Sequence, residues 1–208
     1  MALDDFYSNF VFILRWIHIL AGIMWVGHLY FFNFVNAQFQ LVLEKELKPK
    51  VNPLLMGRAL FWFRWGAMIT FLAGITLLLA KYGHPRAAGN LWMDEATGKL
   101  SHRAMWILFG GLLGTIMWFN VWFIIWPAQK QILGWVKAAQ SPPEMAGLVK
   151  RATHASKVNT YLSGPMLFGM IAPNNYGSLN LCTLLVVVAI AVGTIYTLYK
   201  VSPKVGQI

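Results

Sequence analysis

Two histidines, His18 and His28, lie in the apolar stretch RWIHILAGIMWVGHLYFFNF at residues 15–34. An ionisable side chain at membrane depth costs free energy, so such residues usually serve a function. Neutral imidazole is a common ligand of haem iron. The stretch therefore predicts a membrane-spanning helix that binds a redox cofactor.

Three residues accompany His18 at helical spacing: Arg15, Gly22 and Trp25. Offsets of three and four residues keep all four on one face of a helix. A histidine can bind the iron of haem b, a glycine leaves room for the ring, and an arginine pairs with a propionate. We therefore predict that Arg15, His18 and Gly22 contact haem b. In the alternative, His18 bonds a neighbouring helix and Arg15 extends to the interface.

His28 lies about 15 Å along the helix axis from His18, so the two cannot bind one iron. Other histidines could complete each site. An outer pair would join His18 to His102 or His84, and an inner pair would join His28 to His154. These pairs predict two stacked haems. The simpler alternative is one haem, with the remaining histidines at the membrane interfaces.

Two further polar residues lie within apolar stretches. Arg64 stands between Trp62 and Trp65, where it could neutralise an inner propionate or extend to lipid phosphate. Asn120 lies in MWFNVWF, and an amide at that depth must face the interior of the bundle. We expect Asn120 to hold two helices together.

Composition predicts an all-α membrane bundle. Of 208 residues, 58% are hydrophobic and only 12% are charged, too few to cover a soluble domain. We predict one domain with five apolar runs long enough to cross a bilayer; the alternative is four spans and a re-entrant segment. These runs are about 10–34, 60–81, 104–127, 158–173 and 180–200. They contain no carboxylate, which disfavours a proton-coupled carrier.

The net charge of +10 predicts orientation rather than nucleic-acid binding. Segments 37–59 and 128–157 and the C-terminus together hold eleven Lys and Arg residues. Segment 81–103 holds four, and the N-terminus is acidic. Because basic residues remain on the cytoplasmic side, we predict an inner-membrane protein with its N-terminus outside and its C-terminus in the cytoplasm.

Four segments, in order, resemble the membrane domain of the cytochrome-linked urate hydroxylase (PuuD) family. They are LRWIHILAGIMWVGHLYFF, FWFRWGAMITFLAGITLLL, MWFNVWFIIWPAQKQI and NTYLSGPMLFGMIAPNNYG. The resemblance implies a membrane oxidoreductase, with a redox-relevant His18 and with Asn159, Tyr161 and Pro165 in the fourth-span motif. The resemblance covers the membrane domain and not the C-terminal cytochrome c module of that family, which we expect to be absent here. Electrons would therefore pass to a separate partner, such as a cytochrome c or a respiratory complex.

The stretch LRWIHILAGIMWVG is also similar to the first span of the haem-containing membrane protoporphyrinogen oxidase (HemJ). Both resemblances place the redox-relevant histidine at His18. We therefore expect a haem-binding membrane protein that acts in oxidation or electron transfer. The alternatives are a non-redox scaffold subunit of a larger membrane complex and a small-molecule carrier that uses Arg15 and Asn120.

Overall fold

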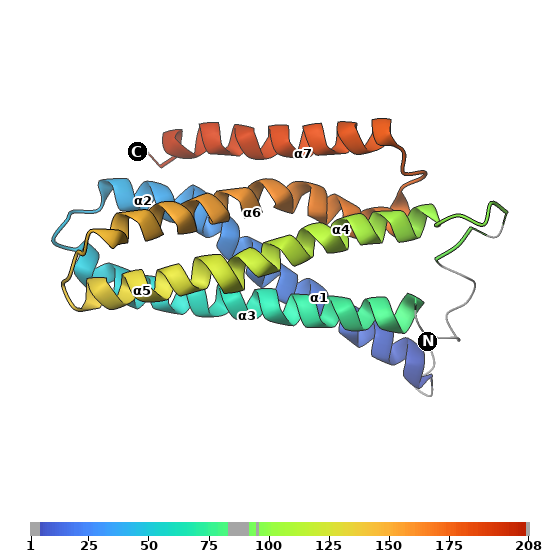
Figure 1. The fold of residues 1–208 in the computed structure, drawn as a ribbon, viewed down its shortest axis with the longest axis horizontal. Helices are drawn as coiled ribbons and strands as arrows, with labels where there is room; N and C mark the ends of the chain where they lie inside the picture. Colours follow the sequence, from blue (N-terminus) through green and yellow to red (C-terminus); the bar gives the residue numbers. More distant parts are fainter. Residues whose placement is uncertain (1–4, 83–91, 95, 207–208) are drawn as a thin grey trace.

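The computed structural model describes residues 5–82, 92–94 and 96–206. They form a bundle of long helices, which confirms the predicted all-α class (Figure 1). The elements are α1 (Phe6–Tyr30), η1 (Phe31–Asn36), α2 (Ala37–Val42), α3 (Lys48–Tyr82), α4 (His102–Phe119), η2 (Asn120–Ile125), α5 (Trp126–Lys137), α6 (Glu144–Asn175), α7 (Leu181–Val201) and η3 (Ser202–Lys204).

Four helical stretches are long and apolar enough to cross a membrane: Phe6–Val42, Lys48–Lys81, His102–Lys137 and Leu181–Lys204. The fifth predicted span, 158–173, lies within α6, which runs the length of the same bundle (Figure 1). Helix α6 is less apolar because it packs against α4, α5 and α7 and buries polar side chains. The composition and packing fit a multi-pass membrane protein.

The helices extend well beyond the apolar runs that predict them. Much of segments 37–59 and 128–157, expected as connections, is helical, and the connections themselves are 43–47 and 138–143. Bilayer thickness limits the apolar part of a helix and not the helix itself. A charged end can therefore continue the same helix into water.

The first residues of α1 and the last residues of α7 lie at opposite ends of the bundle (Figure 1). Helix α2, the α5–α6 connection and the C-terminal end of α7 share one end. The starts of α1 and α4 and the end of α3 share the other. The segments at each end are therefore the ones whose Lys and Arg residues were counted together to predict the orientation.

Glycines bring the helix pairs into close contact. A Cβ at Gly66 of α3 would lie 3.1 Å from the backbone N of Trp25 in α1. A Cβ at Gly169 of α6 would lie 2.8 Å from the backbone of Gly110 in α4. Small residues commonly allow such backbone approach between membrane helices. The α1–α3 and α4–α6 pairs are thus fixed by sterically required glycines.

The largest buried cluster joins α1, α3 and the α4–η2 helix. Its members include Trp25, Leu29, Phe63, Met117 and Val121, each no more than 2% exposed. This core holds α1 and α3 against the central helices and so fixes the positions of the two histidines of α1.

Candidate cofactor site

His18 lies in the contact between α1 and α3. Its Nδ1–H donates to the backbone carbonyl of Thr70 at 2.8 Å. Gly74 makes room for the ring, because a Cβ there would lie 2.9 Å from the Cε1 atom of His18. With Nδ1 protonated, Nε2 keeps its lone pair and can act as a ligand. The structure therefore places His18 at a helix–helix contact with one nitrogen available.

His28 has the same tautomer but different surroundings. Its Nδ1–H donates to the carbonyl of Met24, one turn earlier in α1, at 2.7 Å. The bond fixes the ring and leaves Nε2 with its lone pair, as in many metal-binding histidines. The imidazole lines a groove between α1 and α3. His28 thus combines a fixed ring, an available nitrogen and adjacent space.

The groove beside His28, which we call the inner groove, has a volume of about 510 Å³. Small-molecule sites typically have volumes of about 300–1,000 Å³. Arg58 contributes the one cationic side chain of its lining, and its Nη1 donates to the Leu54 carbonyl at 2.9 Å. The full lining is Ile23, Met24, Gly27, His28, Phe31, Leu55, Arg58, Ala59 and Trp62.

The lining of the inner groove includes the kinds of side chain that can hold a flat cofactor with acidic side groups. A Cβ at Gly27 would meet nothing within 4 Å, so that side of α1 leaves open space next to His28. Trp62 supplies an aromatic wall, and Arg58 can pair with a carboxylate. Sequence reasoning predicted a histidine, a glycine and an arginine around His18. The structure places such a set around His28.

Gly27 and Arg58 were missed for different reasons. Gly27 directly precedes His28, and helical spacing alone does not show whether a neighbouring glycine faces packing or space. Arg58 lies outside the apolar run 60–81 and was counted only as a basic residue of a connection. Since α3 begins at Lys48, Arg58 is a helical residue one turn before Trp62. The length of α3 was the missing information.

The residues predicted to assist His18 are used in other ways. Gly22 packs on Thr70, because a Cβ at Gly22 would lie 3.8 Å from the Cγ2 atom of Thr70. Trp25 is 2% exposed in the core, and Arg15 is exposed one turn before His18. His18, Gly22 and Trp25 do share a face, as expected, and that face contacts α3.

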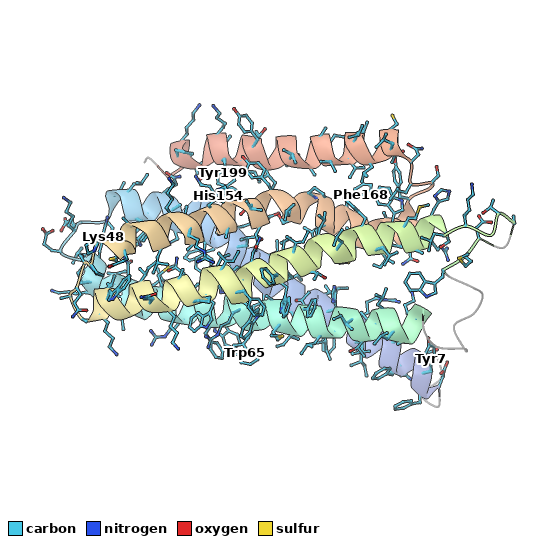
Figure 2. The ribbon with its side chains drawn as sticks, viewed as in Figure 1. Tyr7, Lys48, Trp65, His154, Phe168 and Tyr199 are labelled. Carbon is cyan, nitrogen blue, oxygen red and sulfur yellow. The ribbon has the colours of Figure 1, made fainter. Side chains whose placement is uncertain are left out.

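No contact joins the predicted histidine pairs among the described residues. The Nδ1 of His102 accepts the backbone N–H of Leu179 at 3.0 Å. A neutral imidazole that accepts at Nδ1 carries its proton on Nε2, which makes that nitrogen unsuitable as a ligand. His154 is exposed on α6 (Figure 2). His84 lies outside the described residues, and the described part of the chain holds no cluster of three or more His, Cys, Asp or Glu suited to a metal.

Arg64 lies apart from the lining of the inner groove. Its guanidinium carbon is 3.7 Å from the centre of the Trp126 ring, on α5. Trp62, two residues earlier, lines the groove, and residues two apart on a helix face nearly opposite ways. The predicted contact of Arg64 with an inner propionate therefore has no support from its position relative to His28.

Polar side chains also meet at the centre of the bundle. Asn120 donates to the Asn159 side chain at 2.8 Å, and Asn159 donates to the Met117 carbonyl at 2.9 Å. This confirms the expected role of Asn120 in holding helices together. Asn33 donates to Ser156 at 2.8 Å and accepts from Tyr199 at 2.9 Å.

Asn33 and Asn120 both lie in π-helical segments, η1 and η2, where the wider turn alters the direction of side chains. Of the residues implied by the resemblance, Asn159 and Pro165 are buried in α6. The Tyr161 ring lies 5.5 Å from the Tyr199 ring. These contacts join η1, α4, η2 and α7 to α6.

These features define a helical membrane bundle with a histidine-lined groove between its first two long helices. The chain belongs to the urate oxidase N-terminal family, whose model matches residues 87–203, more than half of the sequence. No curated protein and no solved structure matches the chain. The matched region contains the Asn120–Asn159 contact and helices α4 to α7. His18, His28 and Arg58 precede it.

Proposed function

We propose that this protein is a haem-binding membrane oxidoreductase or electron-transfer protein that takes part in urate oxidation. Membership of the urate oxidase N-terminal family supports the link to urate. The observation that carries the haem proposal is the His28 ring, fixed by Met24 and lining the inner groove with Nε2 available. Bound haem would supply one-electron redox chemistry.

The side chains of the inner groove have separate roles in this proposal. His28 would hold the iron through Nε2, while the bond to Met24 keeps its ring in place. Arg58 would pair with a propionate, and the open side of Gly27 would leave room for the cofactor. The remaining lining is largely apolar, which favours haem over polar ligands.

His18 is the second candidate ligand, as the sequence predicts. It has the same free nitrogen, but its ring is packed against Gly74 of α3. Occupation of both histidines would give two haems, one at each level of α1. The finer resemblance to the PuuD membrane domain supports His18, and the open groove supports His28.

The proposal includes a bilayer location and a redox partner. The chain would cross the inner membrane with its N-terminus outside and its C-terminus in the cytoplasm, as the charge distribution suggests. Electrons would pass between the haem and a separate protein, such as a cytochrome c or a respiratory complex.

Haem content of three variants tests this proposal. Protein purified from haem-replete cells should show a Soret band that shifts on reduction with dithionite. His28→Ala should lose the haem or turn it high-spin, because one axial bond is removed. His154→Ala is the control, since His154 is exposed on α6. Its spectrum should match that of the wild type.

A pyridine haemochrome assay gives the number of haems per chain. If His18 holds a second haem, His18→Ala should remove about half of the absorbance, since each site would hold one macrocycle. A colourless wild-type protein would reject the haem proposal and favour a scaffold or carrier. A coloured His28→Ala protein with an unchanged low-spin spectrum would return the assignment to His18.

A further inference from the structure

Apart from the inner groove, an aromatic surface lies on the side of α3 that faces α4 and α5. Trp65 meets Trp122 edge-on at 5.7 Å, and Phe71 stacks on Trp118 at 4.1 Å. Figure 2 labels Trp65, where α3 runs beside these helices. We call this surface the aromatic seam; its residues are Phe61, Arg64, Trp65, Phe71, Trp118, Trp122 and Trp126.

Three hydrogen-bond donors in the aromatic seam have no partner in the described structure. They are Nε of Arg64 and the indole Nε1 atoms of Trp118 and Trp122, all of them buried. A buried donor left unpaired destabilises a protein, so buried polar groups nearly always have a partner. A fourth such atom, Nε1 of Trp25, belongs to the α1–α3 core. The concentration of three in one seam indicates a place for a ligand.

All three unpaired groups donate, and none can accept. Indole has only an N–H, and guanidinium has only N–H groups. The membrane helices contain no Asp or Glu that could pair with Arg64 from within the bilayer. The complementary ligand therefore carries acceptor oxygens. The exposed aromatic rings of Phe61 and Trp65 favour a ligand that is itself a flat ring.

The seam is also open to the bilayer at one edge. Phe61 is 44% exposed and Trp65 is 41% exposed, and both lie on membrane-spanning α3. A ligand that enters there must dissolve in lipid. Trp118 and Trp122 lie about one helical turn apart, so their indoles lie on the same side of the helix. A quinone head group combines a flat ring, a carbonyl on each side and a lipid-soluble tail.

We propose that the aromatic seam binds the head group of a lipid-soluble quinone. Arg64 and the indole N–H groups of Trp118 and Trp122 donate to its carbonyl oxygens. Trp65 and Phe71 contact the ring. This proposal concerns binding alone and does not depend on whether haem occupies the inner groove.

Titration of haem-free protein with a short-tailed ubiquinone tests the proposal. The protein is placed in quinone-free lipid nanodiscs, and quenching of tryptophan fluorescence reports binding. Wild-type quenching should saturate. Trp122→Phe keeps the ring but removes the N–H, and Kd should rise about fivefold for one lost hydrogen bond. Arg64→Leu should weaken binding about tenfold or more, because bonds from charged donors are stronger.

Trp16→Phe is the matched control, because Trp16 is 58% exposed on α1, away from the seam. It removes one fluorophore and should leave Kd unchanged. If Arg64→Leu fails to fold, Trp118→Phe provides a second test with the same expected rise as Trp122→Phe. Non-saturating quenching that is equal in all variants would show partition into lipid and overturn the proposal.

A separate haem titration distinguishes the main alternative. If Arg64→Leu weakens haem binding while no variant changes quinone quenching, Arg64 serves a propionate and the quinone proposal is wrong. If the protein binds no haem but quenching saturates and depends on Trp122, the haem proposal fails while the quinone site stands.

Discussion

At the residue scale, His18 and His28 show that two histidines of one helix can have different surroundings. Each donates Nδ1–H to a backbone carbonyl, His18 to Thr70 of α3 and His28 to Met24 one turn earlier in α1. The two rings also differ in the glycine beside each of them, which is in α3 for His18 and in α1 for His28. Gly74 lets His18 pack tightly, whereas Gly27 leaves open space beside His28. The neighbour, and not the histidine itself, decides which ring adjoins a ligand-sized groove.

The close fit of His18 against Gly74 predicts that Gly74→Ala lowers the free energy of unfolding of the wild type but raises that of the His18→Ala variant. In Gly74→Ala, the new Cβ would lie 2.9 Å from the ring, so the imidazole must move and its bond to Thr70 weakens. We expect a loss of about 1 kcal/mol in the free energy of unfolding. In a His18→Ala background, the same change should gain about 0.5 kcal/mol, since alanine is the better helix former.

Unfolding in SDS, followed by tryptophan fluorescence, measures both effects. Equal losses in the two backgrounds would mean that Gly74 is needed for some contact other than the one with His18.

At the element scale, close packing of α4 on α6 rests on two facing glycines. A Cβ at Gly110 would lie 2.9 Å from the backbone of Gly169, which has no side chain to move aside. Gly110→Ala should therefore force the helices apart and lower the free energy of unfolding by about 2 kcal/mol. Gly111→Ala is the matched control on the same helix, because its Cβ would meet nothing within 4 Å.

Thermal unfolding of the two variants in the same detergent makes this comparison. The Gly111→Ala protein should be as stable as the wild type or slightly more stable. A similar loss of stability in both variants would show that alanine destabilises α4 itself and not its contact with α6.

The elements also show what the sequence could predict. Apolar runs located four long spans and the core of α6, because membrane thickness acts directly on hydropathy. They did not predict that α3 begins at Lys48, since water-exposed helical turns carry no apolar signal. Asn120 was placed correctly because a buried amide requires a partner. The inner groove was not predicted, since it depends on how α3 lies against α1.

At the scale of the whole molecule, charge and fold divide the chain in the same way. Helix α2, the α5–α6 connection and the end of α7 meet at one end of the bundle. The sequence places eleven basic residues in these segments and their helical extensions, and four in segment 81–103. The inner groove and Arg58 lie toward the basic end, where α3 begins.

The orientation can be tested with single cysteines, because the chain has only Cys182. In a Cys182→Ser background, Lys137→Cys places a thiol at the exposed end of α5, and Lys99→Cys places one before α4. A membrane-impermeant maleimide should label Lys99→Cys in intact spheroplasts and Lys137→Cys only after lysis, because basic connections stay in the cytoplasm. The cysteine-free background should remain unlabelled. Reversed labelling would place the inner groove in the outer leaflet, and a redox partner of His28 would then have to approach from outside.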